Sequence, residues 1–103
     1  MGLLDFLFGN KSNAIQTYLE KDAEIIDVRT AQEWNAGHLS KAKHIPLSEL
    51  SSNIENLKAL NKPIIVHCQS GIRSEKGARL LKSHGIDAIN GGSIAKMNAL
   101  LKE

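Results

Sequence analysis

The chain has 103 residues, of which 42% are hydrophobic and 23% are charged, and these values suit a single soluble domain with a modest core. A formal net charge of +2 and an aromatic content of 4% provide no basic, aromatic-rich surface, so nucleic acid is not an expected partner. The single cysteine, Cys68, excludes an internal disulfide, and a lone thiol is most at home in a reducing compartment, so we expect a cytoplasmic protein.

The first residues are apolar but lack the organisation of a targeting segment. Asp5 interrupts the apolar run Leu3–Phe8, and neither a positively charged start nor a small-residue cleavage site accompanies it. The run is too short to span a bilayer, so we do not expect an integral membrane protein. We expect residues 1–12 to be an apolar appendage, a short turn of helix on the surface of one domain at residues 13–103. Exposed apolar clusters also mark docking sites, which is the alternative for this run.

Helix and strand signals alternate through the first half of the domain. The expected elements are a helix over 14–20 capped by Asn13 and Gln16, a strand over 24–28, a short helix started by the box Thr30–Glu33 and ended at Gly37, a short strand over 44–46, and a helix capped by Ser48 or Ser52 that carries Leu50, Ile54 and Leu57.

The second half continues the alternation. The expected elements are a strand over 64–67, a helix over 74–83 that stops at Gly85, a strand over 86–89, a turn at residues 90–92, and a C-terminal helix capped by Ser93. Strands that alternate with helices predict an α/β fold, with a short parallel central sheet and helices on both faces. Sites in such sheets form outside the carboxyl ends of the strands, and Cys68 follows the expected strand 64–67.

The stretch around Cys68 has the pattern of a nucleophile site. An apolar strand, a tight loop that contains Gly71 and the start of a helix bring backbone N–H groups around one point. A thiol at that point ionises more easily than a free one, with Arg73, Lys76 and Arg79 as candidate cations. A buried, inert thiol is the alternative interpretation.

Three blocks of residues resemble the single-domain rhodaneses, a family of sulfurtransferases. Residues 27–39, continued by Ala42 and Ile45-Pro46, are similar to the family's Asp-Val-Arg, Glu-aromatic, Gly-His-Ile and Asn-Ile-Pro signature. Residues 68–73 resemble its Cys-x-x-Gly-x-Arg loop, and residues 90–92 its Gly-Gly before the final helix. Lys41 and His44 depart from the pattern, because the family usually has Gly and often Asn there.

The resemblance implies a sulfurtransferase in which Cys68 is the catalytic nucleophile. Its thiolate takes the sulfane sulfur of thiosulfate or a similar small donor, sulfite leaves, and the resulting persulfide passes its sulfur to cyanide, a thiol or a protein thiol. No dissociable cofactor is implied. The residues expected to bind the substrate, mainly through loop N–H groups, are Gln69, Ser70, Gly71, Ile72 and Arg73.

Two alternative functions remain open. Some rhodanese-like domains are sulfur relays or interaction modules with little turnover, and the apolar run Leu3–Phe8 favours such docking. Cysteine phosphatases and arsenate reductases carry Cys-x5-Arg, whereas Cys68 and Arg73 enclose four residues, a tighter loop that suits one sulfur atom better than a tetrahedral oxyanion.

Outside the loop, the sequence mostly indicates structural roles. Asp27 and Arg29 are expected to form an ion pair, with direct substrate contact as the alternative. Capping alone accounts for Glu33, and Trp34 is expected to fill the core. Because neighbouring strand residues point to opposite faces, His67 is not expected to pair with Cys68. The four histidines lack metal-ligand spacing, so no metal is expected.

Overall fold

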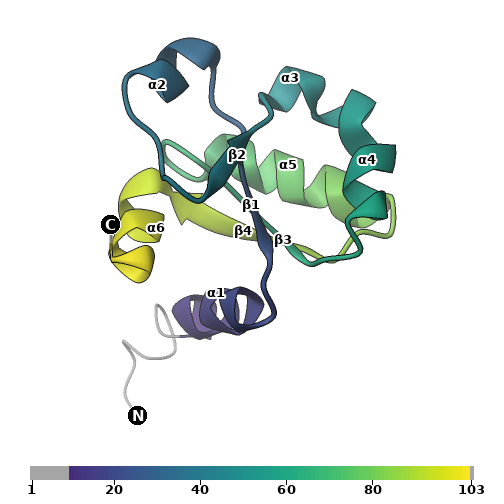
Figure 1. Ribbon diagram of the computed structural model, residues 1–103, viewed down its shortest axis with the longest axis horizontal. Coiled ribbons are helices and arrows are strands. Elements are labelled where there is room, and N and C mark those ends of the chain that lie inside the picture. Colours follow the sequence, from purple (N-terminus) through teal and green to yellow (C-terminus); the bar gives the residue numbers. More distant parts are fainter. Residues whose placement is uncertain (1–9, 103) are drawn as a thin grey trace.

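The computed structural model describes residues 10–102 and is built around a four-stranded sheet in the order β2-β1-β3-β4 (Figure 1). Every pair of neighbouring strands in it is parallel, so the predicted α/β fold is confirmed. The strands are β1 (Glu24–Asp27), β2 (Ala42–His44), β3 (Ile64–Cys68) and β4 (Ala88–Ser93). The helices are α1 (Asn10–Glu20), α2 (Ala31–Asn35), α3 (Leu47–Leu50), α4 (Ile54–Ala59), α5 (Ile72–Ser83) and α6 (Ile94–Leu101), with a 3₁₀ turn, η2 (Ser51–Asn53), before α4.

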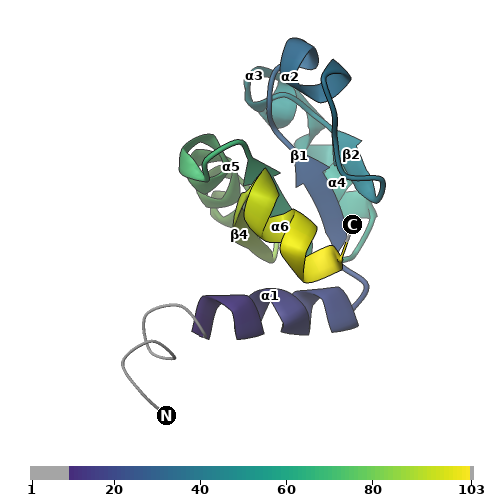
Figure 2. The same cartoon turned by 90° about the vertical axis from the view of Figure 1, so that its left-hand side faces the viewer.

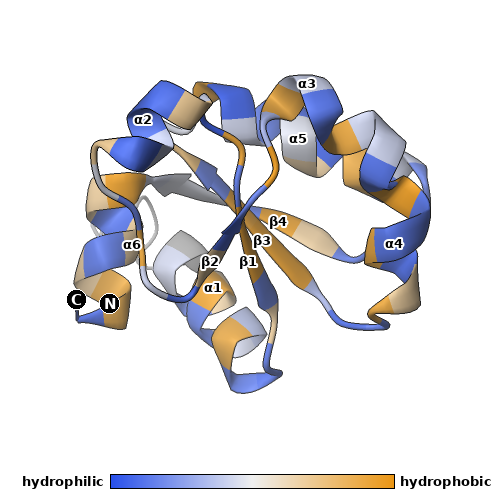
Figure 3. Cartoon of the chain, turned by 45° about the horizontal axis from the view of Figure 1, so that its top comes forward, coloured by the Kyte–Doolittle hydropathy of each residue, from blue (hydrophilic) through white to orange (hydrophobic). Residues whose placement is uncertain are grey.

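Helices cover both faces of the sheet and enclose two separate hydrophobic clusters. Helices α3, α4 and α5 pack on one face, and helices α1 and α6 pack on the other (Figures 1 and 2). Figure 3 shows apolar residues along β1, β3 and β4 and polar residues over much of α2. This arrangement follows because the central strand β3 is buried at every position and carries apolar residues that face both sides of the sheet. Within residues 10–102, no helix has the length and apolar character needed to cross a membrane.

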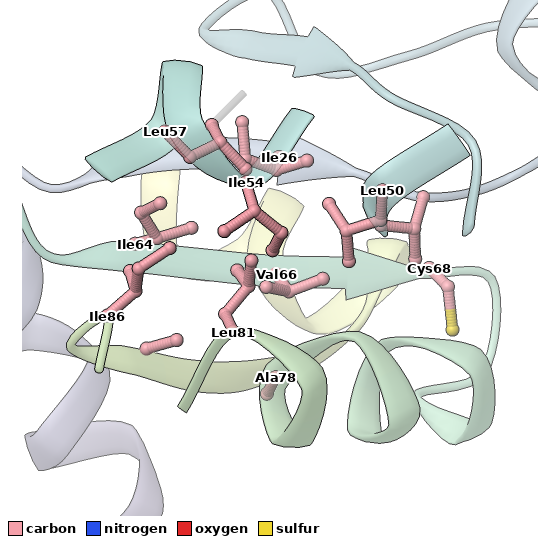
Figure 4. Close-up of a cluster of buried hydrophobic side chains, with 12 residues drawn as sticks. Ile26, Leu50, Ile54, Leu57, Ile64, Val66, Cys68, Ala78, Leu81 and Ile86 are labelled. Carbon is pink, nitrogen blue, oxygen red and sulfur yellow. The ribbon is translucent and has the colours of Figure 1, made fainter. Parts of the chain in front are cut away.

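Strand β3 lies in the middle of the sheet and is buried at all five positions. Alternate side chains face opposite sides, so Ile64, Val66 and Cys68 join the cluster under α3, α4 and α5, whereas Ile65 joins the cluster under α1 and α6. In Figure 4 the sulfur of Cys68 projects from the end of β3 toward the start of α5. The central strand β3 therefore places the thiol at the carboxyl edge of the sheet. Cys68 is the last residue of the strand, whereas the sequence predicts it just beyond the strand.

Two of the predicted helix starts are wrong. Helix α1 begins at Asn10, so Asn13 lies within the helix instead of capping it, and the expected boundary between residues 12 and 13 falls inside α1. Neither Ser48 nor Ser52 caps a helix, because α3 begins directly after Pro46, whose fixed φ of −53° suits a helix start. The apolar run Leu3–Phe8 lies outside the described residues.

The predicted strand over 86–89 is confirmed only at its last two residues, because β4 begins at Ala88, and the predicted turn at residues 90–92 is wrong, because β4 continues through it to Ser93. Val66 pairs with Asn90 and His67 pairs with Gly92, so Gly91 is the extra residue of a bulge. A Cβ atom at Gly91 would lie 2.7 Å from Ile65 Cγ2 and 2.8 Å from Met97 Sδ, and a glycine is therefore needed where the bulge presses on the core. Two glycines suggested a turn, whereas packing against β3 and α6 keeps them in the sheet.

We predict that Gly91→Ala destabilises the fold, because the new methyl group overpacks the rigid Ile65 side chain. Overpacking of this kind costs about 2 kcal/mol, which lowers the Tm of a domain of this size by roughly 10 °C. Thermal unfolding followed by circular dichroism measures the change. An unchanged Tm would contradict the close packing of β4 against Ile65 and Met97.

Candidate active site

The sulfur atom of Cys68 lies within a ring of hydrogen-bond donors. The N–H of Gly71 donates to Sγ at 3.0 Å, and the N–H of Ser74 lies 3.4 Å away. The Ser74 hydroxyl is also 3.4 Å from Sγ, although its single proton is shared with Asn90 Oδ1, which is closer at 2.6 Å. Cys68 is fully buried, with an exposure of 0%. The thiol is thus sealed from solvent, but the amides that follow it point at the sulfur.

The ring of donors governs the ionisation of the thiol. Burial raises the pKa of Cys68, whereas the Ser74 hydroxyl and the N–H groups of Ser74, Gly71 and Ser70 lower it. The net effect holds the pKa of Cys68 below its ordinary value. The predicted cations donate no hydrogen bond to Sγ, although Arg73 is close enough to interact with Cys68 electrostatically. The donors that stabilise the thiolate are the Ser74 hydroxyl and the main-chain N–H groups of the loop.

Strand β4 fixes the shape of the loop. Gly71 adopts a φ of +100°, and a Cβ atom there would lie 3.3 Å from Gly92 Cα. Asn90 Nδ2 donates to the Gly71 carbonyl at 3.0 Å, while its Oδ1 accepts from the Gly92 N–H at 2.8 Å as well as from Ser74. Asn90 therefore connects the loop, the bulge and the first turn of α5. The sequence predicts Asn90 only as part of a turn, and its position before the two glycines is the available signal of a larger role.

Asp27 and Arg29 form the predicted ion pair. The Arg29 Nε atom donates to both Asp27 carboxylate oxygens, at 3.0 and 2.9 Å, and both residues are buried. The remaining guanidinium nitrogens donate to the Gly37 carbonyl at 2.7 Å and to Gln69 Oε1 at 3.2 Å. The pair thus braces the first loop residue after Cys68 from the neighbouring strand β1.

Arg73 donates no hydrogen bond to the sulfur, although it interacts with Cys68 electrostatically, and it forms a bidentate ion pair with Glu33 on α2. The distances are 2.7 Å from Nη1 to Oε1 and 2.9 Å from Nη2 to Oε2. These hydrogen bonds, together with one from the Thr30 N–H, lower the pKa of Glu33 to about 2. The predicted capping box at Thr30 is confirmed, but capping alone does not explain Glu33. Glu33 and Arg73 are 40 residues apart in the sequence, so no local sequence pattern predicts their contact.

Three histidines have structural partners. Trp34 is half-buried and does not fill the core. Instead, its ring stacks on His38, with centroids 3.5 Å apart, and on His44 at 4.8 Å. His44 Nε2 donates to the Arg29 carbonyl at 2.7 Å. His67 points away from the sulfur, and burial lowers its pKa, while Asp27 at 3.8 Å from Nε2 opposes this effect.

Comparisons with known proteins agree with this geometry. The family described as "Rhodanese-like domain" matches residues 12–94. This chain belongs to the rhodanese-like domain family. The uncharacterized protein YqhL of Bacillus subtilis is 35% identical over 69 residues, which are 67% of this chain and 54% of YqhL. The putative sulfur carrier protein YrkF of the same organism is 34% identical over 70 residues, 68% of this chain and 37% of YrkF.

The structure of the human single-domain sulfurtransferase TSTD1 is similar to this rhodanese-like domain along nearly its whole length. It has a TM-score of 0.66 and 30% identity, and the match covers 88% of this chain and 93% of that protein. The two curated relatives are longer, since this rhodanese-like domain spans about half of one and little more than a third of the other.

The rhodanese-like domain brings most of the predicted site residues to one edge of the sheet. Gln69 and Ser70 are exposed, Gly71 and Arg73 are half-buried, and Ile72 is 71% exposed at the start of α5. Of the other predicted cations, Arg79 pairs with Glu75 at 3.0 Å and Lys76 is exposed on α5. Within the described part of the chain, no group of three or more His, Cys, Asp or Glu side chains is placed to hold a metal ion.

We predict that Ser74→Ala moves the ionisation of Cys68 to higher pH. The variant removes a hydroxyl donor and keeps both N–H donors, so the thiolate loses stabilisation and the pKa of the thiol rises. Because Cys68 is the single cysteine, the ultraviolet absorbance of the thiolate during a pH titration measures this change directly. Ser83→Ala, which removes an exposed hydroxyl from the same helix, is the matched control. An unchanged midpoint of the thiolate titration in Ser74→Ala would show that the hydroxyl donates only to Asn90 Oδ1 and does not stabilise the thiolate.

Proposed function

We propose that this chain is a sulfurtransferase in which Cys68 carries a sulfane sulfur, taken from thiosulfate or a similar donor, to a thiophilic acceptor such as cyanide or a thiol. The observation that carries the proposal is the set of main-chain donors aimed at Cys68 Sγ, with the Gly71 N–H at 3.0 Å. The reaction is assigned to residues 13–103, with residues 1–12 as a proposed appendage whose last three residues form the start of α1. A cytoplasmic location remains a prediction from the lone thiol.

The transfer takes two displacements. The Cys68 thiolate attacks the outer sulfur of thiosulfate, a bond forms between Sγ and that sulfur, and the bond to the sulfite sulfur breaks with its electron pair. Sulfite leaves with two negative charges, and the persulfide on Cys68 keeps one. In the second step the acceptor attacks the outer sulfur of the persulfide, and the electron pair of the breaking bond returns to Sγ.

The loop is suited to hold the negative charge in both states. The N–H groups of Gly71 and Ser74 reach Sγ before any sulfur is bound. A terminal persulfide sulfur would extend past Sγ toward the other N–H groups of the loop, which Gly71 and Asn90 keep curved around this point. Since Cys68 has no exposed surface, a donor requires a small outward movement of residues 69–71. Two of these residues, Gln69 and Ser70, are already at the surface.

Intact-mass spectrometry after incubation with excess thiosulfate tests the proposal. We expect the wild-type chain to gain the mass of one sulfur atom and to lose it on addition of cyanide. Cys68→Ser, checked for folding by circular dichroism, should gain nothing. A wild-type mass that never increases, or an increase that persists in Cys68→Ser, would refute the proposed role of Cys68.

A sulfur relay is the second candidate, and the similarity to the putative sulfur carrier YrkF favours it. A relay would accept one sulfur and release it only to a specific partner, because the buried Cys68 seldom meets small molecules. We expect this chain to act as an enzyme and to form many thiocyanate molecules per chain when thiosulfate and cyanide are both in excess. A colorimetric thiocyanate assay on a known amount of protein measures the number of molecules formed per chain. About one thiocyanate per chain would favour the relay.

A further inference from the structure

The hydroxyl of Ser74 lies between two acceptors and has a single proton to donate. Its Oγ atom is 2.6 Å from Asn90 Oδ1 and 3.4 Å from Cys68 Sγ. The shorter distance is that of a good hydrogen bond between oxygens, whereas a neutral sulfur is a weak acceptor. Ser74 and Cys68 have no exposed surface and Asn90 is 9% exposed, so water cannot easily replace either acceptor. The charge on the sulfur therefore decides which acceptor the proton faces.

Hydrogen bonds on its other side fix the orientation of the Asn90 amide. Nδ2 donates to the Gly71 carbonyl at 3.0 Å and to Glu75 Oε1 at 3.3 Å. Oδ1 therefore faces Ser74 and Gly92, and the Gly92 N–H donates to it at 2.8 Å. Because the Gly92 N–H remains in place, Oδ1 keeps a partner when the Ser74 hydroxyl turns away from it. The bulge of β4 thus holds an acceptor that can release the hydroxyl without becoming unpaired.

The charge states of the sulfur favour different orientations of this hydroxyl. In a thiol or a persulfide Sγ is nearly neutral, and a buried hydroxyl without a good acceptor is strongly unfavourable, so Asn90 Oδ1 accepts its proton. A thiolate is a full anion, and a hydrogen bond to an ion is roughly twice as strong as one between neutral groups, so the hydroxyl then turns to Sγ. In the second step of the proposed transfer, the electron pair returns to Sγ as the acceptor takes the outer sulfur. The hydroxyl is within reach of the atom where that charge develops.

We propose that Asn90 is a positioning residue, whose Oδ1 holds the Ser74 hydroxyl while Sγ is uncharged and releases it to Sγ when the sulfur becomes an anion. This inference deepens the proposed function and rests on it, because it assigns a hydrogen bond that stabilises the leaving Cys68 thiolate. The proton stays on Oγ throughout, so the exchange is a rotation about one side-chain bond and no covalent bond changes. The hydroxyl and Asn90 Oδ1 each keep a partner in both states.

A double-mutant cycle on the thiolate titration of Cys68 tests this exchange. Asn90→Leu removes the competing acceptor but keeps the branching of the side chain, and it is measured alone and together with Ser74→Ala. When Ser74 is present, loss of the competitor leaves the hydroxyl to the thiolate, which lowers the pKa of Cys68. In the Ser74→Ala background only the loss of the hydrogen bonds to Gly71 and Gly92 remains. We expect the shift caused by Asn90→Leu to be about half a pH unit lower with Ser74 present, a roughly threefold difference in the ionisation constant.

The charged side chains around the site do not enter this comparison, because all of them are present in the four proteins of the cycle. Those on α5 are Arg73, Glu75, Lys76 and Arg79, and those from β1 and α2 are Asp27, Arg29 and Glu33. Arg73, which interacts with Cys68 electrostatically, therefore affects both backgrounds alike. The control variant is Asn98→Ala, which changes an exposed asparagine on α6 and should leave the midpoint of the titration unchanged.

A residue that only braces the loop would give the same shift in both backgrounds. Equal shifts, or a shift that is higher with Ser74 present, would overturn the inference. Asn90→Ala, which also removes the acceptor, should give a difference of the same sign and replaces Asn90→Leu if circular dichroism shows that variant to be unfolded. The titration needs no sulfur donor, so it is independent of the intact-mass experiment. The expected difference in a chain that takes up no sulfur would support the exchange of the hydroxyl and refute the proposed function.

Discussion

A negatively charged sulfur at the end of a buried strand needs donors within reach, and the backbone after β3 supplies them. Cys68 sits in the same hydrophobic cluster as Val66 and Leu81, an environment that disfavours a thiolate. The N–H groups of Gly71 and Ser74 offset that cost because the chain turns back sharply into α5. The shape of this turn therefore decides whether Cys68 behaves as an apolar side chain or as an anion.

The turn depends on a neighbouring strand as much as on its own residues. Asn90 on β4 donates to the Gly71 carbonyl and accepts from the Ser74 hydroxyl, and the bulge at Gly91 brings Gly92 against Gly71. The register shift moves β4 by one residue just beside Cys68. The bulge in β4 and the loop around the sulfur therefore pack directly against each other, and this close contact requires small residues in both segments.

The order of elements, the parallel sheet and the position of Cys68 were all predictable, because they follow from apolar strands separated by helix-sized segments. The Asp27–Arg29 pair was also predictable, since the two residues are near in sequence and end a buried strand. What could not be predicted depends on contacts between distant segments. Glu33 has a complete local explanation in its capping box, and only the tertiary fold places Arg73 opposite it. Likewise, two glycines after Asn90 indicate a turn until β3 and α6 are known to pack against them.

The short helix α2 is fastened to the site from two sides. Glu33 is joined to Arg73 at the start of α5, and the Gly37 carbonyl after the helix accepts from Arg29, which also holds Gln69. An outward swing of the loop must therefore drag α2 or break these contacts, so the two segments open cooperatively. Because the Glu33–Arg73 pair is partly exposed, dissolved ions weaken it. We therefore expect higher ionic strength to loosen this attachment and to expose the buried sulfur more often, although no ion needs to touch the sulfur itself.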